Sequence, residues 1–272
     1  MSDRVLVAGA TGGVGQLTVA QLLDKGWTVR VLTRNVQKAR QMFGERVEVA
    51  EGDIRQAETL PDAMQGVTHI ICVTGTTAFP SSRWQFELPS QLNPLESLQE
   101  WSKIYLDASY RNAKAKNSPQ DVDAMGVSNL VNAAPKDLKR FVFVSSIGID
   151  RKDKFPYSLL NGFGVLDAKQ KGEDAIMRSQ LPYTIIRPGR LIDGPYTSYD
   201  LNTLLKAKTN GKQGIVIGTG DTLGGQTSRI DVAAACAECL SHPETTNKTF
   251  EIVNQGTRPS TIDWGKLFSQ LV

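Results

Sequence analysis

The 272-residue sequence has little of several features that mark particular classes of protein. Its three cysteines are too few for a disulfide framework in a chain of this size, and they indicate a reducing compartment. No apolar run approaches the roughly 18 residues that a membrane-spanning helix needs. Lys and Arg never form a block of five, and the net charge is only +3. The sequence therefore gives no support to a disulfide-rich, membrane-spanning or nucleic-acid-binding protein.

What the chain does contain is typical of a globular protein, with 40% hydrophobic and 22% charged residues. Its length fits one large α/β domain, or a nucleotide-binding domain with a smaller appended part. The first strand is expected to begin near Arg4, which leaves no room for a cleavable leader.

Short apolar runs alternate with helical patterns along most of the chain, which predicts βαβ units and a parallel sheet. A Gly at position 26 suits the end of the first helix. The predicted strands cover residues 4–8, 28–33, 46–50, 68–73, 140–144, 183–187, 214–217 and 249–253. Helices are expected before Gly26 and over residues 36–43, 58–65, 121–134, 164–179, 200–207, 231–240 and 262–271.

This alternation breaks between residues 79 and 119, where the chain is polar and contains four prolines. Residues 95–116 fit a helix, and we interpret about residues 85–116 as an insertion. A compact domain rarely carries so long a connection without using it, for instance as a lid or as a docking surface for a protein partner. Its aromatic residues would form such a face, or would pack against the parent domain; they are Trp84, Phe86, Trp101 and Tyr105.

A glycine-rich loop, GATGGVG, follows the first predicted strand and opens the first helix. In this context glycines allow a tight turn and close approach of a ligand, and the helix N-terminus offers N–H groups to a pyrophosphate. The loop therefore predicts dinucleotide binding rather than a purely structural turn. Its candidate cofactor-binding residues are Gly9, Thr11, Gly12, Gly13, Val14 and Gly15.

The residues after the second strand indicate which dinucleotide is bound. Enzymes that use NAD usually carry an Asp or Glu there for the ribose 2′-OH, whereas this chain has Arg34, with Lys38 one helical turn beyond. An Arg fork binds a 2′-phosphate that a carboxylate would repel, so we expect NADP(H), unless Arg34 is only a solvated surface charge. Asp53 and Ile54 follow the third strand, where Asp53 would accept from the adenine amine or simply cap a loop.

Small or backbone-exposing residues follow the later strands as well. Ligands of open parallel sheets bind beyond the carboxyl ends of the strands, so these residues are candidates to lie along the cofactor. The alternative is that they only help the chain to turn. They are Thr74, Gly75, Thr76, Ser145, Ser146, Pro188, Gly189 and Arg190.

Together these motifs resemble the atypical short-chain dehydrogenase/reductases, in particular the NAD(P)-binding family that includes NmrA-like sensors and biliverdin or flavin reductases. The resemblance rests on GATGGVG, on GDI, on DxxGVSNLV, on FVFVSS and on AKQKGEDAI with LPYTIIRPGRL. It is strongest to plastid and cyanobacterial members. It implies a doubly wound Rossmann sheet in one domain, with a small C-terminal substrate lobe mainly from residues 190–272, in the cytoplasm or a plastid stroma-like compartment.

The resemblance also identifies catalytic positions. Lys169 matches the family Lys that holds the nicotinamide ribose, and Ser146 matches the catalytic Ser, but the Tyr position is Val165, which cannot transfer a proton. The Tyr110–Lys114 spacing lies inside the insertion, and we interpret it as chance. Hydride transfer to an acceptor that needs little acid help remains open, such as a flavin, a quinone or a conjugated tetrapyrrole.

Two functions therefore follow from the sequence. The first is an NADPH-dependent reductase of an unidentified small molecule, with its proton supplied by solvent, Tyr196 or Tyr199. The second is a non-catalytic NADP(H)-binding sensor or assembly factor that docks a protein partner through the insertion. Cys236, Cys239 and His242 recur every third residue, yet no second cluster completes a zinc site, so we expect core packing and no metal.

Overall fold

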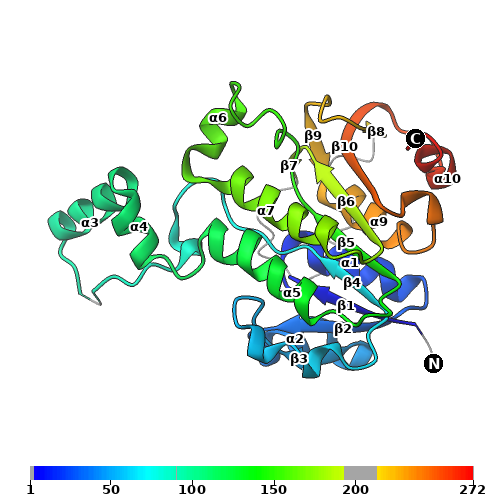
Figure 1. The fold of residues 1–272 in the computed structure, drawn as a ribbon, viewed down its shortest axis with the longest axis horizontal. Helices are drawn as coiled ribbons and strands as arrows, with labels where there is room; N and C mark the ends of the chain where they lie inside the picture. Colours follow the sequence, from blue (N-terminus) through cyan, green and yellow to red (C-terminus); the bar gives the residue numbers. More distant parts are fainter. Residues whose placement is uncertain (1–2, 90, 193–212, 272) are drawn as a thin grey trace.

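The computed structural model describes residues 3–89, 91–192 and 213–271, and it places an eight-stranded sheet between two layers of helices (Figure 1). The strand order is β3-β2-β1-β4-β5-β6-β10-β8, and every neighbouring pair is parallel except β10 with β8. These strands are β1 (Arg4–Ala8), β2 (Thr28–Thr33), β3 (Glu48–Glu51), β4 (His69–Cys72), β5 (Arg140–Val144), β6 (Tyr183–Pro188), β8 (Gln213–Gly218) and β10 (Lys248–Thr257). The predicted doubly wound α/β fold is confirmed.

The central strands are mostly apolar because helices cover both faces of the sheet. Residues of β1 alternate between the two cores: Val5 and Val7 pack on one side, and Leu6 and Ala8 on the other. The first side is covered by α1 (Gly13–Asp24), α2 (Val36–Phe43) and α9 (Arg229–Glu238). The second side is covered by α5 (Val127–Ala133) and α7 (Val165–Arg178).

The chain changes direction across the sheet at β1. It first builds β2 and β3 on one side of β1 and then returns to add β4, β5 and β6 on the other side. The loops that leave β1 and β4 therefore diverge, and such a switch point is where open α/β sheets bind their ligands.

Residues 85–116, which we call the arm, project from the body as two helices, α3 (Pro94–Leu106) and α4 (Ala108–Lys114) (Figure 1). The two chain segments at its base, which we call the neck (residues 83–87 and 114–117), run antiparallel. The Phe86 and Ala115 backbones form a β-bridge, and the Glu87 N–H donates to the Lys114 carbonyl at 2.8 Å. The single helix predicted over residues 95–116 is wrong, because Asp107 takes an extended conformation and caps α4.

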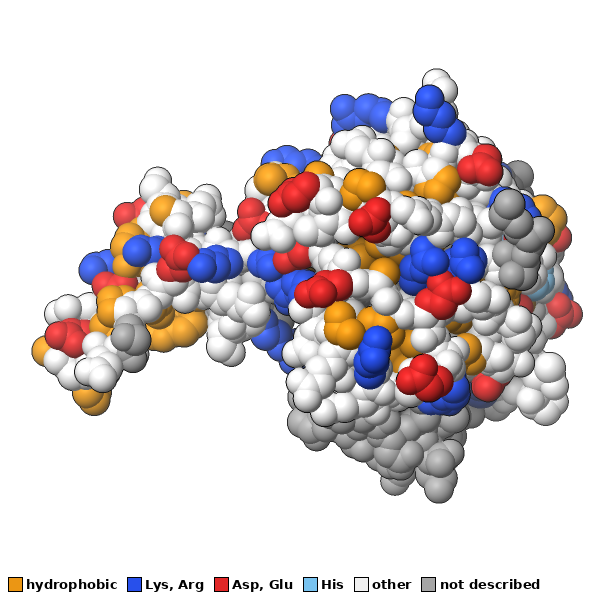
Figure 2. Space-filling view, turned by 90° about the horizontal axis from the view of Figure 1, so that it is seen from below, with side chains coloured by type: hydrophobic (Ala, Val, Ile, Leu, Met, Phe, Trp, Pro, Cys, Tyr) orange, Lys and Arg blue, Asp and Glu red, His pale blue; other side chains and the backbone are white. Residues whose placement is uncertain are grey.

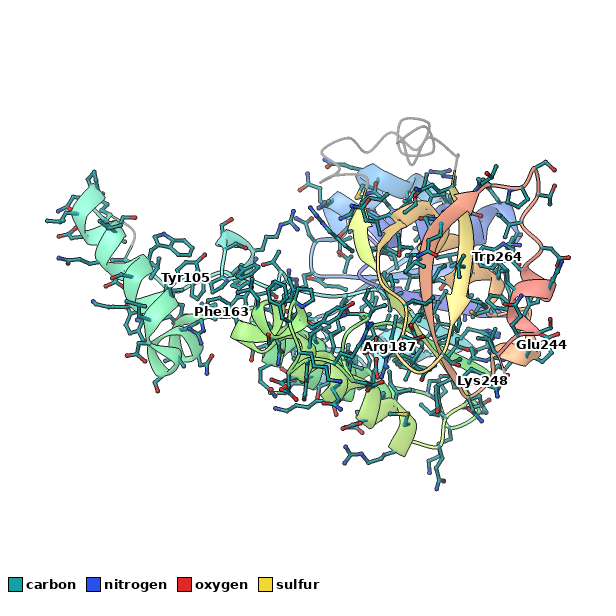
Figure 3. The ribbon with its side chains drawn as sticks, turned by 90° about the horizontal axis from the view of Figure 1, so that it is seen from above. Tyr105, Phe163, Arg187, Glu244, Lys248 and Trp264 are labelled. Carbon is teal, nitrogen blue, oxygen red and sulfur yellow. The ribbon has the colours of Figure 1, made fainter. Side chains whose placement is uncertain are left out.

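Aromatic side chains fix the arm against the body. Trp84 is buried, and its indole N–H donates to the carbonyl of Thr77 at 3.2 Å. Tyr105 of the arm meets Phe163 of the body edge to face, with ring centroids 5.6 Å apart (Figure 3). The base of the arm therefore packs against the parent domain, which was one of the alternatives for these aromatic residues.

Other predicted elements differ at their ends. The helix expected over residues 58–65 is two 3₁₀ turns, Ala57–Thr59 and Asp62–Met64, because Pro61 between them lacks a backbone N–H. The helix expected over 121–134 opens as a π-helix, Gln120–Gly126, before α5.

The last helix covers Trp264–Phe268 and is shorter than the predicted 262–271, and β3 begins two residues later than predicted. The helix expected over 200–207 lies outside the described residues. The remaining elements are the helices α6 (Tyr157–Leu160) and α10 (Trp264–Phe268) and the strands β7 (Arg190–Ile192) and β9 (Gln226–Ser228).

The C-terminal region contributes to the main sheet as well as to a separate small one. Strands β10 and β8 extend the eight-stranded sheet beyond β6, whereas β7 and β9 pair with each other in parallel. The described part of the predicted substrate lobe therefore continues the core of the domain.

Candidate functional site

A pocket of about 420 Å³ opens at the carboxyl ends of β1, β2 and β4, at the switch point of the sheet. This volume lies in the range of small-molecule and cofactor sites. Eight of its lining residues were predicted from the sequence: Gly9, Thr11, Gly12, Arg34, Asp53, Ile54, Thr74 and Gly75. The others are Leu32, Thr33, Asn35, Lys38, Gly52, Arg55, Val73, Asn117 and Val122.

The glycine loop forms the floor of the pocket, and two of its glycines are required by geometry. Gly9 has φ +86°, and a Cβ there would lie 2.9 Å from the backbone nitrogen of Thr74. A Cβ on Gly15 would lie 2.1 Å from the carbonyl oxygen of Gly9. The N-terminus of α1 follows this turn directly, with no acidic residue in its first turn. The loop therefore presents a helix N-terminus to the pocket, as a pyrophosphate site requires.

Basic side chains gather on the side of the pocket formed by β2 and β3. Arg34 follows β2 with its side chain 47% exposed, and its Nη1 lies 3.9 Å from Oδ2 of Asp53. Lys38 lines the same pocket from the first turns of α2, whose N-cap is Asn35. A 2′-phosphate that enters from solvent would therefore meet the exposed guanidinium group of Arg34.

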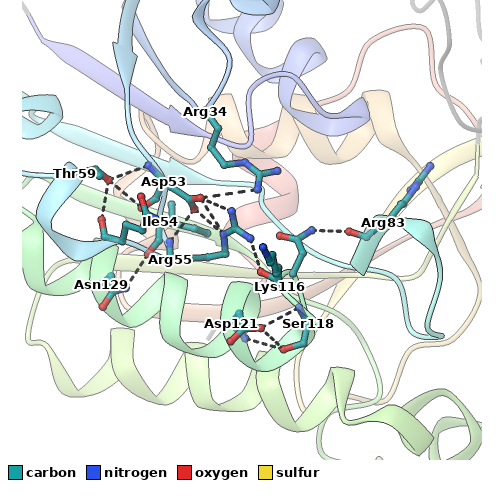
Figure 4. A network of polar contacts seen from close by, with 12 residues as sticks. Arg34, Asp53, Ile54, Arg55, Thr59, Arg83, Lys116, Ser118, Asp121 and Asn129 are labelled. Carbon is teal, nitrogen blue, oxygen red and sulfur yellow. Dashed lines mark hydrogen bonds and ion pairs between the residues drawn. The ribbon is translucent and has the colours of Figure 1, made fainter. Parts of the chain in front are cut away.

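The main partner of the Asp53 carboxylate is Arg55, a pocket residue that was not predicted from the sequence. Nε of Arg55 lies 3.0 Å from both carboxylate oxygens, and Nη2 lies 2.5 Å from Oδ2 (Figure 4). Burial alone would raise the pKa of Asp53, but the hydrogen bonds and charge of Arg55, with the charge of Arg34, outweigh it and lower the pKa. Asp53 is thus ionised and internally paired, so an adenine amine would have to share its oxygens.

Lys169 lies below the loop that follows β4, where it is 7% exposed. Its Nζ lies 2.9 Å from Oδ1 of Asp123, 3.0 Å from the carbonyl of Val144 and 3.3 Å from the carbonyl of Thr74. The two carbonyls accept hydrogen bonds from Nζ, whereas Asp123 is an ion-pair partner whose Oδ1 has no hydrogen bond among the described residues. An ammonium group has three N–H donors, so these two hydrogen bonds leave one donor of Lys169 unused.

Asp123 was not identified as a site residue from the sequence, although it opens the DxxGVSNLV motif. Its Oδ2 accepts from the backbone N–H and the hydroxyl of Thr76, at 3.2 and 3.0 Å. It is fully buried and joins Thr76 to Lys169. Asp123 therefore fixes the Thr74–Thr76 loop at the edge of the pocket.

The other predicted residues lie near this region without lining the pocket. The Ser146 hydroxyl donates to the carbonyl of Ile147 at 3.0 Å, and the buried hydroxyl of Ser145 has no hydrogen-bond partner among the described residues. The Gly189 N–H donates to Thr227 Oγ1 at 2.9 Å. The full set outside the lining is Gly13, Val14, Gly15, Thr76, Ser145, Ser146, Lys169, Pro188, Gly189 and Arg190.

An apolar residue occupies the sequence position of the missing catalytic Tyr. Val165 is buried against Ile149 at the start of α7. Tyr110 lies on the arm, where its hydroxyl bonds to Glu100, and that hydrogen bond raises its pKa instead of lowering it. The Tyr110–Lys114 spacing therefore lacks the chemistry of a catalytic pair. Tyr196 and Tyr199 lie outside the described residues.

The three cysteines are buried in the core. Burial raises the pKa of Cys239 to about 12, so its thiol stays protonated and packs as an apolar group. Across the described ranges, no group of three His, Cys, Asp or Glu side chains could hold a metal ion. No helix in the same ranges has the length and apolar character needed to cross a membrane.

Comparison with known proteins agrees with this architecture. Residues 9–243 match the family described as NAD(P)H-binding. The chain is 30% identical to the protein TIC 62, chloroplastic, of Pisum sativum over 95% of its own length and 44% of that protein, so it spans less than half of this relative. It is also 30% identical to the sanguinarine reductase of Eschscholzia californica, over 98% of this chain and 95% of the relative.

The fold has a counterpart among solved structures. A Bacillus halodurans protein described as an NAD-dependent epimerase/dehydratase superposes with a TM-score of 0.67 and 23% identity, covering 99% of this chain and 100% of the other. The family model matches residues 9–243, and the sanguinarine reductase aligns over nearly the full length of both chains. The chain therefore belongs to the NAD(P)H-binding family, as its resemblance to the atypical short-chain dehydrogenase/reductases predicts.

Proposed function

We propose that this protein is an NADPH-dependent reductase that passes a hydride to a conjugated acceptor, such as a flavin, a quinone or a tetrapyrrole-like molecule. The main support for NADP(H) over NAD(H) is Arg34, which lines the pocket at the position where NAD sites have an acidic residue. Lys38 adds a second positive charge, and Asp53, the one carboxylate among the described residues that line the pocket, is already paired with Arg55. A 2′-phosphate would thus meet positive charge without an unpaired carboxylate beside it.

Different residues of this chain would bind different parts of NADPH. The glycine loop and the N-terminus of α1 would hold the pyrophosphate, and Arg34 with Lys38 would hold the 2′-phosphate. NADPH, when bound, supplies the hydride. Ser145, Ser146 and Lys169 are the proposed residues around the nicotinamide end, where Lys169 would donate to the ribose the N–H that its two carbonyl partners leave unused.

An acceptor that needs little acid help suits this site, because Val165 occupies the place of a catalytic Tyr. Proximity and orientation of the two reactants would then supply most of the rate. The name of the sanguinarine reductase, which aligns with almost the whole chain, supports reductase chemistry. The relative TIC 62 is described as chloroplastic, and this description supports a plastid stroma-like compartment as the alternative to the cytoplasm.

The second candidate function is a non-catalytic NADP(H)-binding sensor or assembly factor. The observation that favours it is the arm, whose helix α3 exposes Leu95 and Leu98 at 65% and 68% and ends in Leu106, exposed at 87%. Hydrophobic side chains lie along the arm among charged ones, and positive and negative side chains are interspersed over the body (Figure 2). Exposed apolar groups of this kind suit contact with a protein partner.

Steady-state turnover with a panel of acceptors separates the two functions. We expect NADPH oxidation with a flavin, quinone or tetrapyrrole, and a fall in kcat of about tenfold or more in Lys169→Ala if the ribose contact orients the nicotinamide. Lys171→Ala is the matched control, because Lys171 lies on the same helix, is exposed and bonds to Gln120. Tight NADPH binding without turnover on any acceptor would contradict the reductase and favour the sensor.

A further inference from the structure

The neck of the arm forms part of the wall of the nucleotide pocket. Asn117, its last residue, lines the pocket together with Arg55. The backbone N–H of Asn117 donates to the carbonyl of Trp84 at 2.9 Å, and its side-chain amide donates to the carbonyl of Arg83 at 2.8 Å. A ligand in the pocket therefore lies beside the two chain segments from which the arm projects.

Arg55 joins this neck to Asp53 on the wall of the pocket (Figure 4). Its Nε and Nη2 donate to the Asp53 carboxylate, while its Nη1 donates to the backbone carbonyl of Lys116. The Arg55 side chain is 21% exposed, and Arg34 approaches the same Oδ2 of Asp53 from the other side at 3.9 Å. A guanidinium group is a rigid fork, so a change on the Asp53 side is transmitted to the Lys116 side.

The guanidinium of Arg55 also keeps hydrogen-bonding capacity. It has five N–H donors, and the bonds to Asp53 and Lys116 use one on Nε, one on Nη1 and one on Nη2. Two donors remain on a side chain that lines the pocket. Negative charge on a bound nucleotide would meet these donors together with Arg34.

We propose that Arg55 is a further nucleotide-binding residue, and that it makes the neck of the arm part of the NADP(H) site. Binding of the nucleotide stiffens the neck through Arg55, and by thermodynamic reciprocity any ligand that stiffens the arm raises the affinity for the nucleotide. This inference rests on the proposed NADP(H) site, and it adds a regulatory connection between that site and the arm.

Isothermal titration with NADP⁺ and amide hydrogen exchange test the proposal on the full chain. Arg55→Ala should weaken NADP⁺ roughly tenfold or more, because charge-assisted hydrogen bonds are lost. NADP⁺ should slow exchange of the neck amides of Glu87, Lys116 and Asn117, which bond across the neck in the free protein. In Arg55→Ala at saturating NADP⁺ this protection should be absent.

Two further variants separate charge, geometry and folding. Arg55→Lys keeps the charge without the fork, so it should regain part of the affinity without the neck protection. Arg83→Ala is the matched control, because Arg83 lies on the neck with its side chain pointing away from Asp53 (Figure 4), and it should bind NADP⁺ like the wild type.

Two results would overturn the proposal: neck exchange that NADP⁺ does not change in the wild type, or protection that is equal in Arg55→Ala and the wild type. If the wild type binds NADP⁺ but the neck does not respond, only this inference fails. If the wild type does not bind NADP⁺, the proposed function fails with it. The wild-type exchange data alone decide the matter if Arg55→Ala does not fold.

Discussion

Arg34 and Asp53 illustrate how neighbouring charges define a ligand. A lone carboxylate on the wall of the pocket would repel a 2′-phosphate, but Asp53 faces the guanidinium groups of both Arg55 and Arg34. The net charge of this corner is therefore positive, although it contains an acid. Arg34, which is less tightly engaged and more exposed than Arg55, is the side chain best placed to accept a new anion.

Removal of Arg34 should abolish the preference for the phosphorylated cofactor. In the wild type, NADPH should raise the melting temperature more than NADH does at equal concentration, because tighter binding to the folded state stabilises it further. In Arg34→Ala the two shifts should become equal, with NADPH bound roughly tenfold or more weakly. Differential scanning fluorimetry measures both shifts, and Arg40→Ala, an exposed change on α2, the helix that follows Arg34, serves as the control. Equal shifts in the wild type would refute the role of Arg34.

The sequence predicted pocket-lining residues that come directly after a strand, and it missed residues whose partners lie far away along the chain. Arg34 could be placed at the pocket because it follows β2, and Gly9 because it follows β1. Asp123 and Arg55 could not, because their partners Lys169 and Lys116 lie far along the chain and meet them only in the folded protein. No local pattern distinguishes a buried Lys with three internal partners from one that faces a ribose.

Helix α7 is tied to strand β6 by an ion pair in the core. Arg187 donates from Nε and Nη2 to the two carboxylate oxygens of Glu173, at 3.0 and 2.6 Å, and its Nη1 lies 2.6 Å from Asp150. Glu173 is 1% exposed and Arg187 is 8% exposed. Burial of two charges costs free energy, and the two parallel hydrogen bonds between Arg187 and Glu173 offset part of that cost.

Breaking one side of this tie should destabilise the protein more than replacing both sides. Glu173→Gln removes the charge that Arg187 needs and should lower the free energy of unfolding by about 3 kcal/mol. The double variant Glu173→Leu with Arg187→Met leaves no buried charge of the pair and should lose less. Urea unfolding followed by circular dichroism gives both values. A double variant less stable than the single one would show that the pair itself stabilises the fold.

At the level of elements, the strands were predicted best, because apolar runs between glycine or polar turns are an unambiguous local signal. Helix boundaries were predicted less well where one residue changes the backbone. Pro61 divides a predicted helix into two turns, and Asp107 turns the chain and caps a second helix in the arm. The π-helical opening of α5 has no sequence signal that we can identify.

The whole molecule consists of a body that holds the nucleotide pocket and an arm that extends away from it (Figure 1). Most of the exposed large hydrophobic side chains lie on the arm or on the adjoining α6 and its flanks, including Leu95, Leu98, Leu106, Phe155 and Leu159. The length of the chain fits one large α/β domain or a nucleotide-binding domain with a smaller appended part, and the sequence predicts an insertion at about residues 85–116. The structure shows that this segment, the arm, has its own helices and is joined to the body by the neck and a few aromatic contacts.

Removal of the outer arm should therefore leave the body folded and able to bind nucleotide. Replacing residues 89–112 by a short Gly-rich turn keeps the neck, Lys116 and Asn117. We expect NADP⁺ affinity within roughly threefold of the wild type and a small fall in melting temperature, because the contact between Tyr105 and Phe163 is lost. Titration calorimetry and thermal unfolding report the two quantities. Loss of nucleotide binding in this variant would mean that the outer helices, and not the neck, shape the pocket.

The neck also bears on how the chain folds and how it can change. Because residues 87 and 114 are hydrogen-bonded neighbours, the arm is a closed loop whose ends already meet on the surface of the body. Doubling the length of such a loop adds only about 0.6 kcal/mol of closure entropy. The sheet of the body can therefore form before the arm is folded. For the same reason, the arm can change in length or sequence during evolution without a change in the order of the strands.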